Sequence, residues 1–201
     1  MWPQTGRAMS EQETDGRRRR SMASRDRIID AVLALIDEDE GIPGAEAIAA
    51  RAGVGMRSLF RHFGDLDGLY VMVIDRIGLR FTHLVRPYES PDWQGQVIEG
   101  LERRMVMFEG ALRYRRFAEA YRQHSATMRH GLDALNRMLR GRLEGIVPQE
   151  VRAGDEIWFE QLDLWLSLES YSRLRGLQNL DHDQTKAVIG AAVAALLAAK
   201  N

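Results

Sequence analysis

The sequence contains no cysteine, which excludes disulfide bonds, thiolate nucleophiles and cysteine-based metal sites. This absence fits a reducing compartment, and we expect the protein to be cytoplasmic. No apolar run approaches the roughly 18 residues that suggest a membrane span, so we expect no membrane partner. Lysine is scarce, because Lys186 and Lys200 are the only two. Arginine supplies the remaining positive charge, and its planar fork suits phosphate and guanine, although a genome-wide arginine bias would give the same composition.

Patterns typical of enzymes are also missing. The chain has no Gly-x-Ser-x-Gly, no His-Glu-x-x-His and no phosphate-cradling glycine loop. His124 and His130 lack the spacing of metal ligands on one helix face. Glu102, Glu109 and Glu119 have arginines nearby, which favours surface ion pairs over acid–base chemistry. We therefore predict a protein that is not an enzyme and that uses no metal or cofactor.

Helical periodicity follows residue 23 almost to the end of the chain, and no stretch alternates with a period of two. The sequence predicts an all-α fold. Residues 1–23 are polar and arginine-rich, and we predict a disordered arm. The proline-containing stretch 87–92 is the expected domain boundary, which gives a three-helix domain with its connecting helix at 24–86 and a larger helical domain at 87–201. The expected helices begin near residue 24 and then cover 45–51, 56–62, 66–85, 93–112, 114–124, 126–145, 155–176 and 182–199.

The segment 44–63 reads as two short helices packed around a tight turn. Ile48 and Leu59 lie at inward positions, and Gly53 stands where a left-handed backbone would be costly for other residues. This is the geometry of a helix-turn-helix, with its recognition helix over Met56–Phe63. Arg57 and Arg61 can each grip a guanine, and Ser58 and His62 can reach phosphates. The outward set on this helix is Met56, Arg57, Ser58, Phe60, Arg61 and His62.

The pattern Ile-Ala-x-x-Ala-Gly-Val, followed by Leu-Phe-x-His-Phe, resembles the TetR family of transcriptional regulators over about Arg25–Val73. The resemblance implies an N-terminal helix-turn-helix domain and a C-terminal domain that binds a small molecule and forms a homodimer. It implies a repressor of transcription that binds a palindromic operator in double-stranded DNA and is released by its ligand.

Four positions depart from the family's usual residues. The family commonly has Thr or Ser at the positions of Gly44 and Gly55, Tyr at that of Phe60 and Lys at that of Leu66. Bare amides at Gly44, Ala45 and Gly55 can still meet phosphates, so these residues complete the predicted DNA-binding set. The lost hydroxyls and lysine leave an alternative open, in which a helical ligand-binding dimer keeps the motif as scaffold and binds DNA weakly or without specificity.

The predicted arm offers a compensation, since Arg17, Arg18, Arg19 and Arg20 can contact phosphates or the minor groove. A solvated tail is the other interpretation of the same run. In the larger domain, aromatic and methionine side chains form the candidate ligand pocket, although core packing would use the same residue types. These are Phe108, Tyr114, Phe117, Tyr121, His124, Met128, Trp158 and Trp165. The candidate dimer interface, which ordinary core packing would also explain, is Leu168, Tyr171, Ala187, Ala191 and Ala195.

Overall fold

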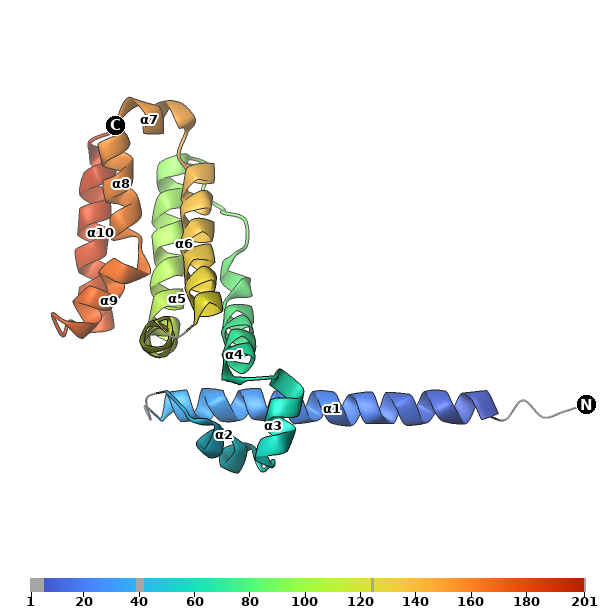
Figure 1. Ribbon diagram of the computed structural model, residues 1–201. Coiled ribbons are helices and arrows are strands. Elements are labelled where there is room, and N and C mark those ends of the chain that lie inside the picture. The colour runs from blue at the N-terminus through green and yellow to red at the C-terminus, as the bar shows by residue number, and fades with distance from the viewer. Residues whose placement is uncertain (1–5, 39–41, 124, 201) are drawn as a thin grey trace, which may run out of the picture. The chain divides into compact units, whose positions relative to one another are not determined.

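The computed structural model describes residues 6–38, 42–123 and 125–200, with side chains from Arg18 onward. Within these ranges the backbone forms helices and loops and no strand, which confirms the predicted all-α fold (Figure 1). The elements are α1 (Gly6–Asp37), α2 (Ala45–Ala52), α3 (Met56–Phe63), α4 (Leu66–Arg80), the short 3-10 helix η1 (Thr82–Leu84), α5 (Trp93–Tyr121), α6 (Ala126–Ile146), α7 (Gln149–Gly154), α8 (Glu156–Trp165), α9 (Leu168–Gly176) and α10 (His182–Ala198).

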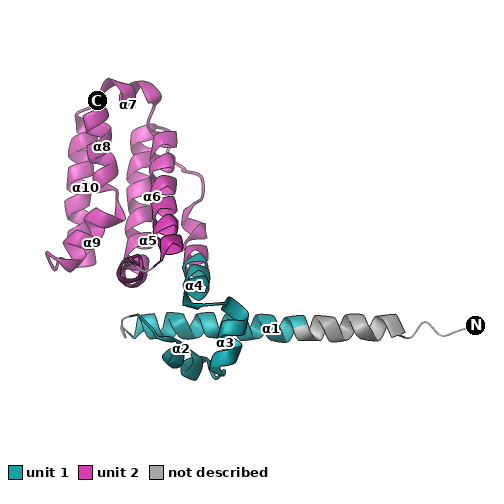
Figure 2. Ribbon diagram, viewed as in Figure 1, with its two compact units in different colours: residues 1–76 teal, residues 77–201 magenta. Residues whose placement is uncertain are grey.

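The chain forms two compact units, Met1–Arg76 and Ile77–Asn201, coloured separately in Figure 2. The division falls inside α4, whereas the sequence suggested a boundary at 87–92. Helix α4 itself ends at Arg80 instead of continuing to 85. The chain therefore passes from one unit to the other within a helix and not within the proline-containing loop.

Helix α1 supplies the main apolar face of unit 1. Its C-terminal half is amphipathic, and α2, α3 and the first part of α4 cover its apolar side. The phenol of Tyr70 on α4 is completely buried and donates a hydrogen bond to the carbonyl of Pro43. The guanidinium of Arg76 bonds to Asp26, which ties α4 to α1. The buried residues of this core are Ile28, Ile29, Ala31, Val32, Leu33, Leu35, Ile36, Ile48, Ala49, Ala52, Leu59, Leu69, Tyr70 and Val73.

The arm predicted to be disordered is helical from Gly6, because α1 continues unbroken to Asp37. No proline lies between Pro3 and Pro43, so nothing in this stretch removes a helical hydrogen bond. The hydrophobic pattern could not reveal this extension, since it has no apolar face of its own. Its helical state comes from continuation of a helix that is already nucleated by the core of unit 1.

The turn between α2 and α3 depends on Gly53, whose φ of 64° and ψ of 38° are left-handed. Its amide bonds to Ala50, and the amide of Val54 bonds to Ala49, which closes α2. A Cβ at Gly53 would meet nothing within 4 Å. The requirement for glycine is therefore in the backbone and not in the available space.

Unit 2 is built around the long helix α5, against which α6, α9 and α10 pack. The buried cluster includes Phe108, whose ring lies 5.8 Å from that of Tyr171. The indole nitrogen of Trp158 donates to the carbonyl of Leu196 at 2.8 Å, which joins α8 to α10. The core residues are Val97, Leu101, Met105, Phe108, Leu139, Leu143, Val147, Trp158, Phe159, Leu162, Leu166, Leu168, Tyr171, Leu174, Ile189, Val193 and Leu197.

Helix α5 has no break near residue 113, although the sequence suggested two helices there. Gly110 lies near the expected break, and there it permits close packing. A Cβ at this position would lie 2.9 Å from the ring of Phe81. The glycine therefore admits an aromatic ring against the middle of a continuous helix.

The expected helix 155–176 is two helices, because α8 ends at Trp165 and α9 begins at Leu168. The hydroxyl of Ser167 accepts a hydrogen bond from the amide of Ser170 and caps α9. The carbonyl of Leu166, freed by the break, accepts a hydrogen bond of 2.7 Å from the buried Arg104. The short helix α7 was not predicted either.

Replacing Gly53 by alanine tests the left-handed turn. We expect Gly53→Ala to lower the free energy of unfolding by about 1 kcal/mol, because a Cβ disfavours this backbone conformation. Gly55→Ala is the matched control, since Gly55 has a φ of −76° and equally open surroundings. Urea denaturation of the two variants gives the comparison. Equal loss in both would contradict a special requirement at Gly53.

Candidate nucleic-acid interface

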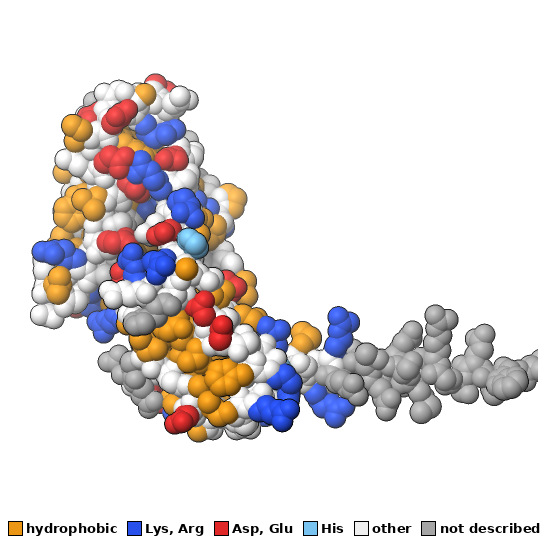
Figure 3. Space-filling model, viewed as in Figure 1, with side chains coloured by type: hydrophobic (Ala, Val, Ile, Leu, Met, Phe, Trp, Pro, Cys, Tyr) orange, Lys and Arg blue, Asp and Glu red, His pale blue; other side chains and the backbone are white. Residues whose placement is uncertain are grey.

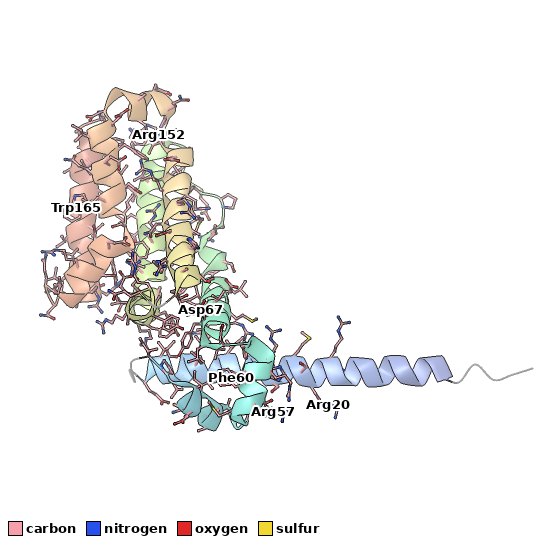
Figure 4. The ribbon with its side chains drawn as sticks, in the orientation of Figure 1. Arg20, Arg57, Phe60, Asp67, Arg152 and Trp165 are labelled. Carbon is pink, nitrogen blue, oxygen red and sulfur yellow. The ribbon has the colours of Figure 1, made fainter. Side chains whose placement is uncertain are left out.

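The second helix of the motif, α3, presents its outer side to solvent. Leu59 is completely buried under it, whereas Met56 and Phe60 are each 38% exposed. Arg57 and Arg61 are also exposed. Figure 4 shows Arg57 and Phe60 on this helix. The structure therefore gathers on one short helix the outward side chains that the sequence singled out.

Two of these outward side chains, Arg61 and Ser58, form a hydrogen bond. A guanidinium nitrogen of Arg61 donates to the hydroxyl of Ser58 at 2.8 Å. On the side of α3 that faces α1, the ring of Phe63 lies 5.3 Å from the guanidinium carbon of Arg25. Phe63 is thus half-buried against α1, as its inward position predicted. These contacts fix α3 against α1 and restrict the positions of Arg61.

Both helices of the motif begin at glycine. Gly44 precedes α2 and Gly55 precedes α3, each in an extended conformation and without a side-chain cap. Both glycines are exposed, and Ala45 is half-buried. The amides at these helix starts carry the positive end of the helix dipole, which favours anions. The absence of cap hydroxyls leaves those amides without a side-chain acceptor.

The N-terminal half of α1 borders a hollow with the end of α3. Its volume is about 630 Å³, and its lining consists of Arg20, Ser21, Ala23, Ser24, Arg27, Arg61 and His62. Blue side chains gather where α1 extends beyond α3 (Figure 3). Arg18, Arg19 and Arg20 are exposed, and the side chain of Arg17 lies outside the described residues. Two serine hydroxyls and three guanidinium groups are a suitable set of donors for a phosphate.

The pKa of His62 reflects the positive charges around this hollow. Partial burial lowers the pKa of His62, and the positive charges of Arg61 and Arg25 lower it further. The described residues that line the hollow include three arginines and no carboxylate. A lining of this kind favours an anion.

None of the predicted ligand residues that the structure describes lines one of the cavities found in unit 2, and their role in ligand binding stays a prediction. Phe108, Tyr114, Phe117, Met128 and Trp158 are buried, and Tyr121 and Trp165 are half-buried. Phe117 and Tyr121 stack at 6.3 Å, while Phe108 and Trp158 belong to the main core. His124 lies outside the described residues. Other side chains of α5, α6, α8 and α9 line the cavities that are described in unit 2.

The predicted dimer residues separate into two groups. Leu168 and Tyr171 are buried in the chain's own core, at 3% and 0% exposure, so their assignment to an interface is wrong. The sequence shows that this segment is apolar on several sides but does not show which side meets its own chain. Ala187, Ala191 and Ala195 are exposed on α10.

Two exposed apolar residues on the neighbouring helix α8 were not among the predicted interface residues. Ile157 is 74% exposed and Leu164 is 60% exposed. They lie seven positions apart and so on one side of α8, away from the side of the buried Trp158 and Leu162. This spacing could have identified them. Val188, on the helix α10 that packs against α8, is a further exposed apolar side chain.

Other kinds of site find no support in the described part of the chain. No group of three or more His, Asp or Glu residues there is arranged to hold a metal ion. Among the described helices, none combines the length and the apolar character that crossing a membrane requires.

No protein-family model matches the sequence, and no curated protein matches it. A solved structure does match the fold: "putative TetR-family transcriptional regulator from Rhodococcus sp.". The match has a TM-score of 0.68, covers 87% of this chain and 98% of the other, and has 16% sequence identity. The two proteins share a fold. The resemblance inferred from residues 25–73 is therefore confirmed for the architecture as a whole.

The charge around His62 can be measured directly. We expect an NMR titration of the free protein to give His62 a pKa below 6.5. Arg61→Gln should raise this pKa, because one of the positive charges that oppose protonation is removed. Arg57→Gln is the control on the same helix. An unchanged His62 titration in Arg61→Gln would contradict the proposed proximity of the two charges.

Proposed function

We propose that the protein is a homodimeric, DNA-binding regulator of transcription, acting in the cytoplasm as a repressor that a small molecule releases from a palindromic operator. One observation carries the proposal: the exposed face of α3 and the arginine-lined hollow beside it lie in the same unit. A face for bases and a site for phosphate are the two parts that specific DNA binding needs. The shared fold supports the same reading.

The exposed side chains of α3 make different contacts with DNA in this proposal. Arg57 is exposed, and its fork can bind the O6 and N7 atoms of guanine. Arg61 is oriented by Ser58 and lines the hollow, so it can contact either a base or a phosphate. Met56 and Phe60 are suited to apolar contact with thymine methyl groups. Amides at Gly44, Ala45 and Gly55 take phosphates in place of the missing hydroxyls.

Helix α1 adds the remaining backbone contacts. In place of a flexible arm that reaches into the minor groove, a helical extension holds Arg20 and Arg27 beside α3. Phosphate binding in this hollow supplies affinity without sequence preference.

Salt dependence of DNA binding tests the role of the hollow. We expect Arg20→Gln and Arg27→Gln each to make the plot of log affinity against log salt shallower by about 0.9, since each removes one phosphate contact. The matched control is Arg137→Gln, which changes an exposed arginine on α6 of unit 2. Slopes equal to that of the unaltered protein would leave the α1 arginines as solvated charges.

A second copy of the chain is needed to read both halves of a palindrome, because the two recognition helices must lie about 34–36 Å apart. The exposed apolar surface of α8 and α10 is suited to pair with its own copy in a four-helix arrangement. Its alanines let helices approach closely, and Ile157 and Leu164 add apolar area to bury. A two-fold interface of this kind uses the same surface on both copies.

Sedimentation can test this interface. We expect Ile157→Asp to convert the dimer to a monomer, because a carboxylate would be desolvated without a partner. Leu177→Asp is the control, since Leu177 is 72% exposed but follows α9, outside the proposed surface. A dimer that survives Ile157→Asp, or is lost equally with Leu177→Asp, would rule out this surface.

Selection from random DNA duplexes tests the function itself. We expect the full chain to enrich a palindrome with half-sites about one helical turn apart. Arg57→Ala should relax specificity at one base of each half-site, at about 1–3 kcal/mol. Equal weakening on all sequences would make Arg57 a phosphate contact instead.

The same selection distinguishes a second function, a ligand-binding dimer that keeps the helix-turn-helix as scaffold. The uncapped starts of α2 and α3 favour this alternative, because the hydroxyls that commonly bind phosphates are absent. No enriched sequence would support it. A palindrome would exclude it.

A further inference from the structure

Three arginines of unit 2 surround one small cavity. Arg103 and Arg104 come from α5 and Arg142 from α6, and all three line a cavity of about 30 Å³. Among the described residues, Glu99 is the one carboxylate that bonds to any of the three, and it bonds to Arg103. The remaining partners are main-chain carbonyls or the ring of Tyr88. Positive charge therefore exceeds negative charge at this cavity.

Arg104 is the deepest of the three, at 7% exposure. Its guanidinium donates to the carbonyl of Leu139 at 2.6 Å and to that of Leu166 at 2.7 Å. Burial lowers the pKa of Arg104 and the charge of Arg142 lowers it too, while Tyr88 and Asp163 favour its charged form. Asp163 is itself paired with Arg140 at 2.8 Å. Carbonyl dipoles satisfy the donors of Arg104 but do not neutralise its charge.

Arg103 has a donor without an acceptor. Its terminal nitrogens bond to the carbonyls of Arg86 and Pro87 and to Glu99. Its side chain is 10% exposed, and its Nε is buried without a hydrogen-bond partner. A buried N–H without an acceptor is costly, so an acceptor in the cavity would be favoured.

Arg142 also packs on the ring of Tyr88. The guanidinium carbons of Arg103 and Arg142 lie 4.9 and 5.1 Å from the centre of this ring. Arg142 has one long bond of 3.3 Å to the carbonyl of Arg86. Its fork is thus held near the cavity by stacking and a weak bond.

The rim of the cavity is apolar. Leu84, Val85, Met107 and Met138 line it with the arginines, and Val85 and Met138 are 44% and 40% exposed. This volume is more than the roughly 10–15 Å³ that a cavity needs to hold one water molecule, but far below the roughly 300 Å³ of a small ligand pocket. The cavity can therefore seat the charged end of a ligand but not a whole molecule. The rest of such a ligand would lie along the exposed rim.

We infer that this cavity binds the carboxylate of a small amphipathic acid, with the apolar part of the ligand on Val85 and Met138 and with Arg103, Arg104 and Arg142 around its charge. A planar carboxylate matches the arginine fork, and it supplies the acceptor that Arg103 lacks. The rim residues Leu84 and Val85 lie at the end of η1, the short helix that comes after α4, in which the chain passes from unit 1 to unit 2. The regulatory meaning of this site rests on the proposed function, but binding itself does not.

Calorimetric titration of the full chain with decanoate, below its micelle concentration and without DNA, tests the inference. We expect saturable binding of one decanoate per chain. Decanol, which has no charge, and acetate, which has no chain, should each bind at least about tenfold more weakly. Equal binding of decanol or of acetate, or no binding of decanoate, would overturn the inference.

Variants locate the site. Arg142→Gln should weaken decanoate binding about tenfold or more, because one charge-assisted contact is lost. Met138→Glu should weaken it similarly by placing like charge at the rim. Arg137→Gln, on an exposed position of the same helix, is the matched control and should leave the affinity unchanged. Unaltered binding by both test variants would overturn the assignment. These titrations contain no DNA, so their failure and the failure of operator selection are separate results.

Discussion

The burial of one face of α1 is the constraint on which unit 1 depends. Ile28, Val32 and Ile36 are fixed in the core, and a helix is stiff along its axis. The direction of the N-terminal half is therefore set by the packing of the C-terminal half. This brings Arg20 and Arg27 to the same hollow as the end of α3. A disordered arm would lose conformational entropy on binding, whereas a helical extension is already ordered.

Glycine at the helix starts has a consequence for recognition. A hydroxyl at Gly44 or Gly55 would both cap the helix and contact a phosphate, so its loss removes two contributions at each position. The stability loss is a few tenths of a kcal/mol, because glycine is itself an acceptable cap. In the proposed function, the arginines of α1 that line the hollow offset the phosphate contacts that those hydroxyls would make.

The sequence revealed α2 and α3 to within a residue because glycines mark both ends of each helix. The sequence was misleading where tertiary contacts determine the ends of a helix. We expected a break near residue 113, but α5 is continuous there and Gly110 accommodates Phe81. The break after Trp165 depends on local serine bonds and on a distant arginine, neither of which has a periodic signal. Tyr171 was assigned to an interface because an apolar side chain predicts burial. The sequence does not show whether its own chain or a second copy covers it. The arginine cavity combines residues 84 to 142 and has no linear motif.

Arg104 shows why that cavity is difficult to explain by stability alone. A buried charge has a desolvation penalty, and apolar side chains of similar volume often hold helices together equally well or better. Here the guanidinium joins α5 to α6 and to the end of α8 through two carbonyls, a task that a neutral donor could perform. What a neutral donor could not supply is charge. Since Arg103 and Arg142 add to that charge and Glu99 is paired with Arg103 alone, the proposed anionic ligand would balance the charge that remains at the cavity.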